Sequence, residues 1–378
     1  MKSRSTIRDR ERITKTRKSE FGRAGRFSVS RFRPFAVWYA LWLLLGVSSG
    51  AVAAPRGRPA TPPSASGDSN VVTRVILGAT YLEVTPWAGR FGLKGTWLEK
   101  GRRLRLENGF TTIVLEADRR ELLINDLRVF LGEPIMVSGG SLWIGAIDAR
   151  DLLGPILRPA GIAITAPTLR VICLDPGHGG NDTGTQNKGL KLEEKRMALE
   201  VAQRVKRLLE ALGYKVIVTR NDDRFVELED RAKIANRGGA DLFVSIHFNS
   251  FPQGSVTGTE TYIVTRRTQR STGGSKRETT DNVEFVGNGM DPWNAVLGYA
   301  MHRQLLGKLG SFDRGLKFAR FKVLTLVNCP GVLVEAGYLS NEAEARKIST
   351  PAYRAEIAAG IVDGVTAYST QLAAAQKK

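Results

Sequence analysis

Cysteine is scarce in this chain of 378 residues, and its scarcity excludes a small fold held together by disulfide bonds. Only Cys173 and Cys329 are present, so the folded parts must rely on a hydrophobic core. We expect two buried thiols, and a single pairing stays open if their strands are neighbours. Neither cysteine lies beside a suitable histidine in the sequence, so no cysteine nucleophile is indicated.

Acidic residues are in short supply relative to basic ones. The chain has 56 Lys and Arg against 37 Asp and Glu, a formal net charge of +19, and about half of the excess lies in the first 33 residues. A basic surface attracts nucleic acid, anionic lipid or a carboxylate-rich cell wall. The basic residues gather in the leader and in one polar loop without interleaved aromatics, so we expect no nucleic-acid partner.

One long apolar run, residues 35–54, follows the arginine-rich start of the chain. It ends in small residues, and Ala51 and Ala53 supply the A-x-A pattern of a secretory cleavage site. Residues 1–54 are therefore predicted to be a basic region plus a signal peptide, and the protein to be exported to the periplasm or cell wall. The alternative is a membrane anchor through residues 35–54, because about twenty apolar residues can span a bilayer.

Composition divides the rest of the chain into three parts. Residues 55–70 are rich in Pro, Ser and Gly and are predicted to be a flexible linker. Residues 71–165 contain short alternating runs such as RRLRLE and FTTIVLEA, which predict a small β-rich module. That module lacks clustered histidines, cysteines or carboxylates, so we expect it to bind or to act as a spacer rather than to catalyse.

Residues 169–372 alternate between strand and helix patterns, which predicts an α/β domain with a largely parallel sheet and helices on both faces. RVICLD, DLFVSIHF and GVLVEAGYL have the apolar character of buried strands. The helix that follows Glu193 and Glu194 ends at Gly213. Its apolar stripe is expected to consist of Met197, Val201, Val205, Leu208 and Leu212.

Three motifs place reactive side chains where strands end. DPGHGG contains His178, SIHFNS contains His247 and VLVEAG contains Glu335. The carboxyl ends of parallel strands meet at one edge of a sheet, so these side chains should converge. Imidazoles combined with a carboxylate are the ligand set of catalytic zinc, which keeps one position open for water.

The residues alone leave the third metal ligand open between Glu193 and Glu194. Acids in the first turn also favour a helix through its dipole, without any metal. Asp175, before the first histidine, and Asn249, after the second, are candidates for supporting or substrate-binding roles, or simple turn residues. His302 is expected to be exposed, while Trp293 and Asn294 are expected to cap their helix or to line the groove.

DPGHGG, a Glu-Lys pair opening a helix, ADLFVSIHFN and PGVLVEAGYLSN occur in this order over about residues 171–368. In this the chain resembles the zinc-dependent N-acetylmuramoyl-L-alanine amidases of the amidase type 3 family. The resemblance implies a Zn²⁺ ion held by His178, Glu194 and His247, because the family's glutamate ligand directly precedes the lysine, here Lys195. It also implies that Glu335 is the general base and that the substrate is peptidoglycan, cleaved between N-acetylmuramic acid and L-alanine.

The position of Glu335 supports this role independently, since a carboxylate after the apolar run VLV is costly unless it meets a cation or a donor. Two alternatives stay open. A zinc peptidase acting on stem peptides would usually have glutamate three residues after its first histidine, but Asn181 stands there. A non-catalytic peptidoglycan-binding protein would lack some of the four groups, and all four are present.

Two further segments carry expectations. Residues 121–157 resemble the small stalk-like modules found ahead of cell-wall amidases and at the start of copper amine oxidases. Residues 265–292 are polar and longer than a compact domain needs. They are expected to form either a solvated loop or a lid over the metal cleft that an activator protein releases, in which case deleting residues 270–288 should raise activity.

Overall fold

The structure is a computed structural model that describes residues 71–274 and 276–377. The leader or anchor predicted for residues 1–54 and the linker predicted for residues 55–70 lie outside the described residues. Within the described ranges, none of the helices has the length and apolar character needed to cross a membrane.

Residues 71–165 form nine short strands and a few short helical turns. The strands are β1 (Thr73–Ile76), β2 (Ala79–Glu83), β3 (Lys94–Glu99), β4 (Arg103–Glu107), β5 (Thr112–Glu116), β6 (Glu121–Ile124), β7 (Leu127–Phe130), β8 (Met136–Ser138) and β9 (Ser141–Gly145). The helical turns are α1 (Val84–Gly89), α2 (Ala146–Asp148), η2 (Ala149–Leu153), α3 (Gly154–Leu157) and η3 (Pro159–Gly161). Strands β1, β2, β9 and β8 make one sheet, and β3 to β7 form an antiparallel meander.

The remaining residues form an α/β domain, as expected. Its strands are β10 (Val171–Pro176), β11 (Gln186–Asn187), β12 (Leu192–Glu193), β13 (Lys215–Val218), β14 (Leu242–Asn249), β15 (Thr259–Val264), β16 (Asp313–Ala319) and β17 (Gly331–Tyr338). Its helices are α4 (Glu194–Ala211), α5 (Leu228–Arg237), η4 (Thr279–Asn282), η5 (Val286–Met290), α6 (Asp291–Leu309), α7 (Lys322–Leu326), α8 (Glu342–Ile348) and α9 (Pro351–Gln376).

The main sheet is mixed rather than parallel throughout. Strands β13, β10, β14 and β17 run parallel, but β15 is antiparallel to β17, and β16 is parallel to β15. The connection between β14 and β15 contains no helix, and it is shorter than the dozen or more residues that a parallel crossover requires. Helix α6 then provides the crossover that sets β16 parallel to β15.

The sheet does not stop at the boundary predicted near residue 165. Leu316 of β16 pairs with Val129 of β7, so the meander continues the main sheet to eleven strands in the order β13-β10-β14-β17-β15-β16-β7-β6-β5-β4-β3. The two parts thus share hydrogen-bonded strands, whereas the sequence indicated a separate stalk.

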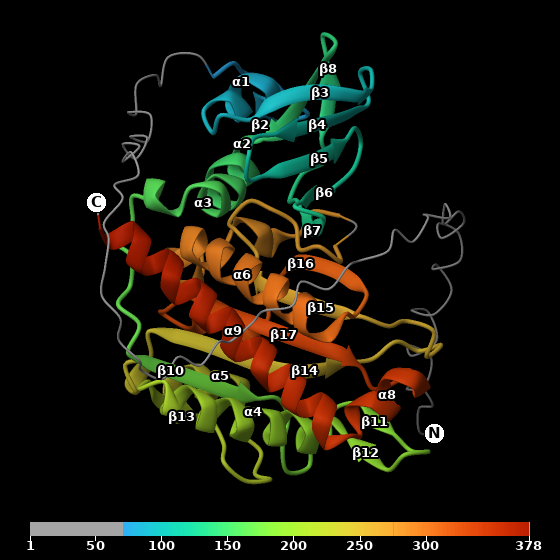
Figure 1. Cartoon of the computed structure of the whole chain (residues 1–378), viewed down its shortest axis with the longest axis vertical. Coiled ribbons are helices and arrows are strands. Elements are labelled where there is room, and N and C mark those ends of the chain that lie inside the picture. The colour runs from blue at the N-terminus through green and yellow to red at the C-terminus, as the bar shows by residue number, and fades with distance from the viewer. Residues whose placement is uncertain (1–70, 275, 378) are drawn as a thin grey trace, which may run out of the picture. The chain divides into compact units, whose positions relative to one another are not determined.

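Helices cover both faces of the parallel strands, with α4, α6 and α9 on one face and α5 and α7 on the other (Figure 1). Side chains of a strand alternate between faces. In β10, Ile172 and Leu174 join the core under α4, whereas Cys173 joins the core under α5. Cys173 and Cys329 are both buried and unpaired with each other, which confirms the expectation of buried thiols.

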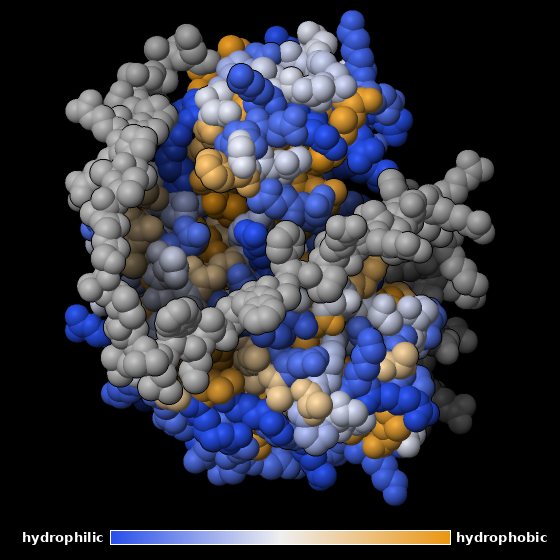
Figure 2. Space-filling model, in the orientation of Figure 1, coloured by the Kyte–Doolittle hydropathy of each residue, from blue (hydrophilic) through white to orange (hydrophobic). Residues whose placement is uncertain are grey.

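The buried stripe of α4 differs from the predicted one. Val201 and Val205 are buried as expected, but Leu208 and Leu212 are 43% and 58% exposed, and Leu209 is buried instead. Small residues of α4 complete the buried side, which lets α9 pack closely beside it. The outer side of α4 is hydrophilic along the lower edge of the view in Figure 2.

His302 was expected to be exposed, and this expectation is wrong. The residue is fully buried in α6, with Nδ1 2.9 Å from Thr261 Oγ1 and Nε2 2.9 Å from Asp313 Oδ1. The side of helix α6 that carries His302 faces strands β15 and β16 of the sheet, so His302 is shielded from solvent although its neighbour Arg303 is exposed. Trp293 and Asn294 are also buried and line no part of the metal cleft. Trp293 Nε1 donates to Ile164 O, and Asn294 holds backbone groups of η5 and β17.

Candidate metal centre

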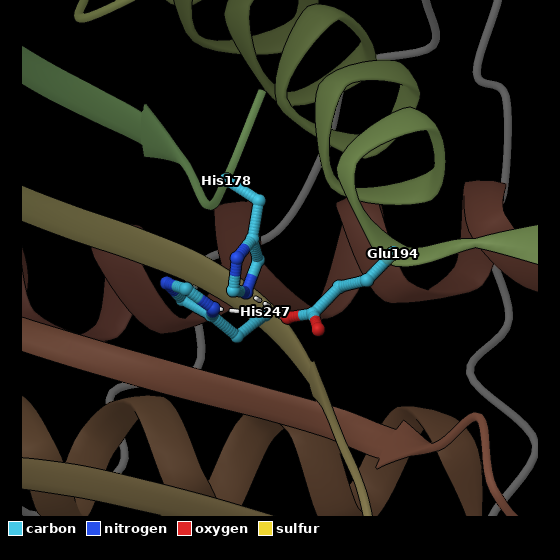
Figure 3. Close-up of side chains that lie close together, drawn as sticks. All are labelled: His178, Glu194 and His247. Atoms are coloured by element: carbon cyan, nitrogen blue, oxygen red, sulfur yellow. Dashed lines mark hydrogen bonds and ion pairs between the residues drawn. The ribbon is translucent and has the colours of Figure 1, made fainter. Parts of the chain in front are cut away.

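Three predicted ligands come together at the carboxyl ends of β10 and β14. Glu194 Oε1 lies 3.1 Å from His178 Nε2 and 2.9 Å from His247 Nδ1. The two imidazole rings face the carboxylate of the first α4 residue (Figure 3). One ligand atom from each residue lies within 4.8 Å of the others, so this cluster could hold one metal ion.

Glu193 stays outside this cluster. It occupies the N-cap position of α4 and its carboxylate lies 2.9 Å from Arg196 Nε. The carboxylate of Glu194 is instead fixed by backbone amides, because Phe248 N donates to Oε1 at 3.0 Å and Thr185 N donates to Oε2 at 2.8 Å. Of the two candidate acids, Glu194 is therefore the one placed beside the histidines.

Glycines allow the close approach of these groups. A Cβ atom on Gly177 would lie 2.2 Å from the His247 ring. A Cβ atom on Gly184, which has a φ of +63°, would lie 2.6 Å from Glu194 Oε2. Neither position can accept a larger residue without displacing a ligand, so the glycines of this loop are part of the site.

Two buried arginines hold the loop that carries His178. Arg220 donates to the carbonyl oxygens of Pro176 and Gly177, at 3.0 and 2.7 Å. Arg231 donates to Pro176 O at 2.8 Å and to His178 O at 2.7 Å. The sequence analysis missed both residues, because their partners are backbone carbonyls far away in the chain.

Asp175 supports this arrangement from below. Its carboxylate is buried and accepts from Arg231 at 2.9 Å, Thr219 at 2.6 Å and Ser245 at 2.8 Å. Asp175 thus anchors the arginine that fixes the His178 loop. This is a supporting role, one of the alternatives that the sequence left open.

Asp182 is a third residue that the sequence analysis missed. Its Oδ2 lies 2.7 Å from His178 Nδ1, so when Nδ1 carries the proton, Nε2 has a free lone pair directed at Glu194. A carboxylate that accepts from the far nitrogen of a ligand histidine fixes both the tautomer and the ring orientation. The spacing of four residues after His178 was the available signal.

The carboxylates of Glu194 and Asp182 favour a positive charge in the cluster. Burial disfavours the charged form of Glu194, but hydrogen bonds from His178 and His247 outweigh this and lower the pKa of Glu194. Burial lowers the pKa of His178, but Glu194 and Asp182 outweigh burial, so the pKa of His178 is raised. A proton held between carboxylates in this way occupies the place that a divalent ion can take.

Glu335 lies next to this cluster, in register with His247 on one side and with Glu260 on the other. Its Oε2 atom is buried and has no hydrogen-bond partner among the described residues. Burial raises the pKa of Glu335 well above its ordinary value, and the nearby charges of Glu194 and Glu260 raise it further. An unpartnered buried carboxylate oxygen beside a metal-type cluster fits a group that handles a proton.

Glu260 is a fourth residue that the sequence analysis missed. Its buried carboxylate accepts from Lys317 at 2.7 Å, Arg314 at 3.1 Å, Tyr262 at 2.6 Å, Tyr338 at 2.6 Å and Asn249 at 3.2 Å. Burial opposes ionisation, but Lys317 and these hydrogen bonds lower the pKa of Glu260 below its ordinary value. Asn249 is accordingly held by Glu260 at the edge of the site.

All four predicted groups open into one cleft with a volume of about 580 Å³. The cleft is also lined by side chains from the start of α5, the end of β14 and α7: Phe225, Glu227, Leu228, Asn249, Ser250, Phe321 and Lys322. No residue of the described parts of segment 265–292 lines it. The expectation that this segment covers the cleft as a lid is therefore wrong.

Segment 265–292 instead packs against residues 120–148. Arg266 Nη2 lies 3.0 Å from Asp148 Oδ1 in a fully buried ion pair. Arg120 donates to Gly274 O at 3.3 Å, and Arg277 pairs with Glu133. Buried pairing of this kind holds the first part of the segment in place, whereas residues 276–280 and 282–284 are exposed, so the segment is only partly solvated and does not cover the metal centre.

Comparison with known proteins gives the family. A family model described as N-acetylmuramoyl-L-alanine amidase matches residues 172–367, about half of the chain. The chain belongs to this family. The matched range contains His178, Glu194, His247 and Glu335 and agrees with the extent of the resemblance seen in the sequence.

Curated relatives include amidases of this family. The chain is 35% identical to N-acetylmuramoyl-L-alanine amidase AmiC of Neisseria meningitidis in an alignment of 218 residues that covers 52% of each chain. It is 31% identical to AmiA of Escherichia coli over 220 residues, 53% of this chain and 76% of the relative. The chain spans about half the length of the first relatives it matches.

A solved structure of an amidase from Clostridium difficile 630 aligns with a TM-score of 0.44 and 32% identity, covering 53% of this chain and 96% of that one.

Proposed function

We propose that this protein hydrolyses the amide bond between N-acetylmuramic acid and L-alanine in peptidoglycan, with zinc as its metal. One observation carries the proposal: His178, Glu194 and His247 converge directly beside the unpartnered carboxylate of Glu335. The family membership supplies the substrate class. The opening of the cluster into a cleft makes it accessible to a ligand.

The donor set fits zinc. Two imidazole nitrogens and one carboxylate oxygen are the ligands of many catalytic zinc sites, which leave a fourth position for water or substrate. Zinc bound there would supply Lewis acidity, which polarises a carbonyl and acidifies water. Asp182 would keep His178 in the tautomer that leaves Nε2 free as a ligand.

Glu335 is proposed as the general base. It takes the proton from the water that attacks the amide carbonyl and returns this proton to the leaving amine of L-alanine. A carboxylate whose pKa is raised by burial and by neighbouring acids holds a proton well enough for the second step. These reaction steps require no nucleophilic side chain.

We further propose export to the periplasm or cell wall, directed by residues 1–54. A partner that acts on residues 265–292 would have to act through their contacts with residues 120–148, since these residues do not cover the cleft.

The test is incubation of purified protein with peptidoglycan, with and without a chelator, followed by mass analysis of released stem peptides. We expect free L-alanine amino termini that disappear with the chelator and return with added zinc. Glu335→Gln should bind zinc but release no peptide. Products cut elsewhere in the stem, or activity unaffected by the chelator, would contradict the proposal.

A further inference from the structure

Three apolar side chains stand exposed in the cleft that contains the metal cluster. Phe225 is 47% exposed, Leu228 is 50% exposed and Phe321 is 36% exposed. All three line the same cavity as His178 and Glu335. Large apolar side chains gathered in a concave site are typical of a ligand-binding surface, and the proposed hydrolysis uses none of them.

These side chains belong to two segments that are fixed to each other. Leu228 is the first residue of α5, Phe225 lies three residues before it, and Phe321 directly precedes α7. Lys322 Nζ lies 3.1 Å from Glu229 Oε1, which joins the first turns of the two helices. The side chain of Asn236 also donates to a backbone carbonyl at the end of α7, at 2.9 Å.

The ring of Phe321 is supported from behind. It packs against the ring of Tyr262 with a centroid distance of 5.1 Å and an interplanar angle of 64°. The hydroxyl of Tyr262 donates to the buried carboxylate of Glu260 at 2.6 Å. The exposed ring is thus placed before any ligand arrives, which reduces the entropy cost of binding.

The part of the cleft beside Phe225 and Leu228 carries an unpaired negative charge. Glu227 lines it, and the carboxylate of Glu227 has no hydrogen bond or ion pair with any residue that the structure describes. Lys322 and Glu229 compensate each other. A ligand group that carries a carboxylate is therefore disfavoured beside Phe225 and Leu228, whereas an uncharged group is not.

We propose that Phe225, Leu228 and Phe321 bind the sugar ring of N-acetylmuramic acid and leave the stem peptide to Thr185, Asn249 and Ser250. This inference rests on the proposed function. The sugar ring is uncharged and presents C–H groups that pack on aromatic side chains. The stem peptide carries free carboxylates and many backbone hydrogen-bonding groups, which suit the polar residues of the same cleft.

Two substrates with the same scissile amide test the inference. One is a muramoyl peptide, and the other carries a D-lactoyl group in place of N-acetylmuramic acid. For Phe225→Ala and Phe321→Ala we expect the KM for the muramoyl peptide to rise about tenfold, equivalent to about 1.4 kcal/mol, with kcat little changed. Kinetics on the lactoyl peptide should stay as in the wild type.

Control variants separate the possible causes. Phe321→Leu keeps an apolar side chain but removes the flat ring, so it should lose most of the preference for the sugar. Phe110→Ala removes a ring that is 93% exposed and lies outside the cleft, so both substrates should be unaffected. Zinc content and the unfolding midpoint should match the wild type in every variant.

An equal loss on both substrates, a loss confined to the lactoyl peptide, or no loss at all would overturn the assignment of the sugar to this surface. Failure of the wild type to cleave either substrate would instead refute the proposed function. The two failures are therefore distinguishable.

Discussion

At the scale of single residues, the metal cluster depends on groups that hold its ligands as much as on the ligands themselves. His178 presents Nε2 to the cluster because Asp182 accepts from Nδ1. The loop before it is held by arginines that donate to backbone carbonyls. Motif and strand-end position were sufficient to predict that His178, His247 and Glu335 lie close together. The sequence could not reveal Arg220, Arg231 or Glu260, because their partners are distant in the chain.

Asp182→Asn is expected to weaken zinc binding by about ten- to a hundredfold, as losses of such outer partners do. The amide can still contact Nδ1, but it no longer stabilises the tautomer that frees Nε2. Competition with a chromophoric chelator measures the affinity. Asp230→Asn, which changes an exposed carboxylate paired with Lys233 on α5, is the matched control. Unchanged affinity in Asp182→Asn would remove Asp182 from the site.

The burial of Glu335 also predicts how the folding stability of the metal-free protein depends on pH. Its pKa in the folded protein is raised, so its contribution to stability is fully present below the unfolded-state pKa and is lost as the pH rises. In the presence of a chelator, Glu335→Gln should therefore match the wild type near pH 4 and become more stable than it as the pH increases. Thermal unfolding across this pH range measures the difference. A gap that narrows with rising pH would contradict the burial argument.

At the scale of elements, strand ends and helix starts were predictable, but strand direction was not. The apolar runs identified β10, β14 and β17, and the Glu-Lys pair identified the start of α4. Strand β15 runs antiparallel to β17 because the connection between β14 and β15 contains no helix. The residue pattern of a strand does not indicate its direction in the sheet. His302 was misjudged because its neighbours in sequence include Arg303, whereas its ring is buried against Thr261 of β15 and Asp313 of β16.

His302→Ala should lower the free energy of unfolding by about 3 kcal/mol. The change leaves the buried Thr261 Oγ1 without its partner between α6, β15 and β16, and it removes one hydrogen bond from the Asp313 carboxylate, which still accepts from the amides of Arg128 and Gly315. A buried group left unsatisfied costs about 1–3 kcal/mol. Urea unfolding measures the loss. Arg303→Ala, at the exposed neighbouring position, should stay within about 0.5 kcal/mol of the wild type. Equal effects would show that His302 is not enclosed as described.

At the scale of the whole described chain, residues 71–165 and the amidase domain form one structure. Composition suggested a boundary near residue 165, because local patterns do not show that β7 and β16 pair. The same hydrophobic core contains Leu106 and Val129 from one part and Phe318 from the other. Deleting residues 270–288 is therefore expected to lower stability, in contrast to the gain in activity that a lid would give.

The buried pair of Asp148 and Arg266 tests this continuity. Asp148→Ala leaves a buried guanidinium without its carboxylate and removes the acceptor for the amides of Gly132 and Glu133, so stability should fall by about 3–5 kcal/mol. The double variant Asp148→Leu with Arg266→Met should recover part of this loss, since no charge is then left unpaired. Arg346→Ala, which breaks an exposed pair with Glu342, should change little.

Urea unfolding followed by tryptophan fluorescence and by circular dichroism should give coincident transitions for the wild type, because strands β7 and β16 cannot separate without exposing the shared core. Two separate transitions in the wild type would mean that residues 71–165 fold independently.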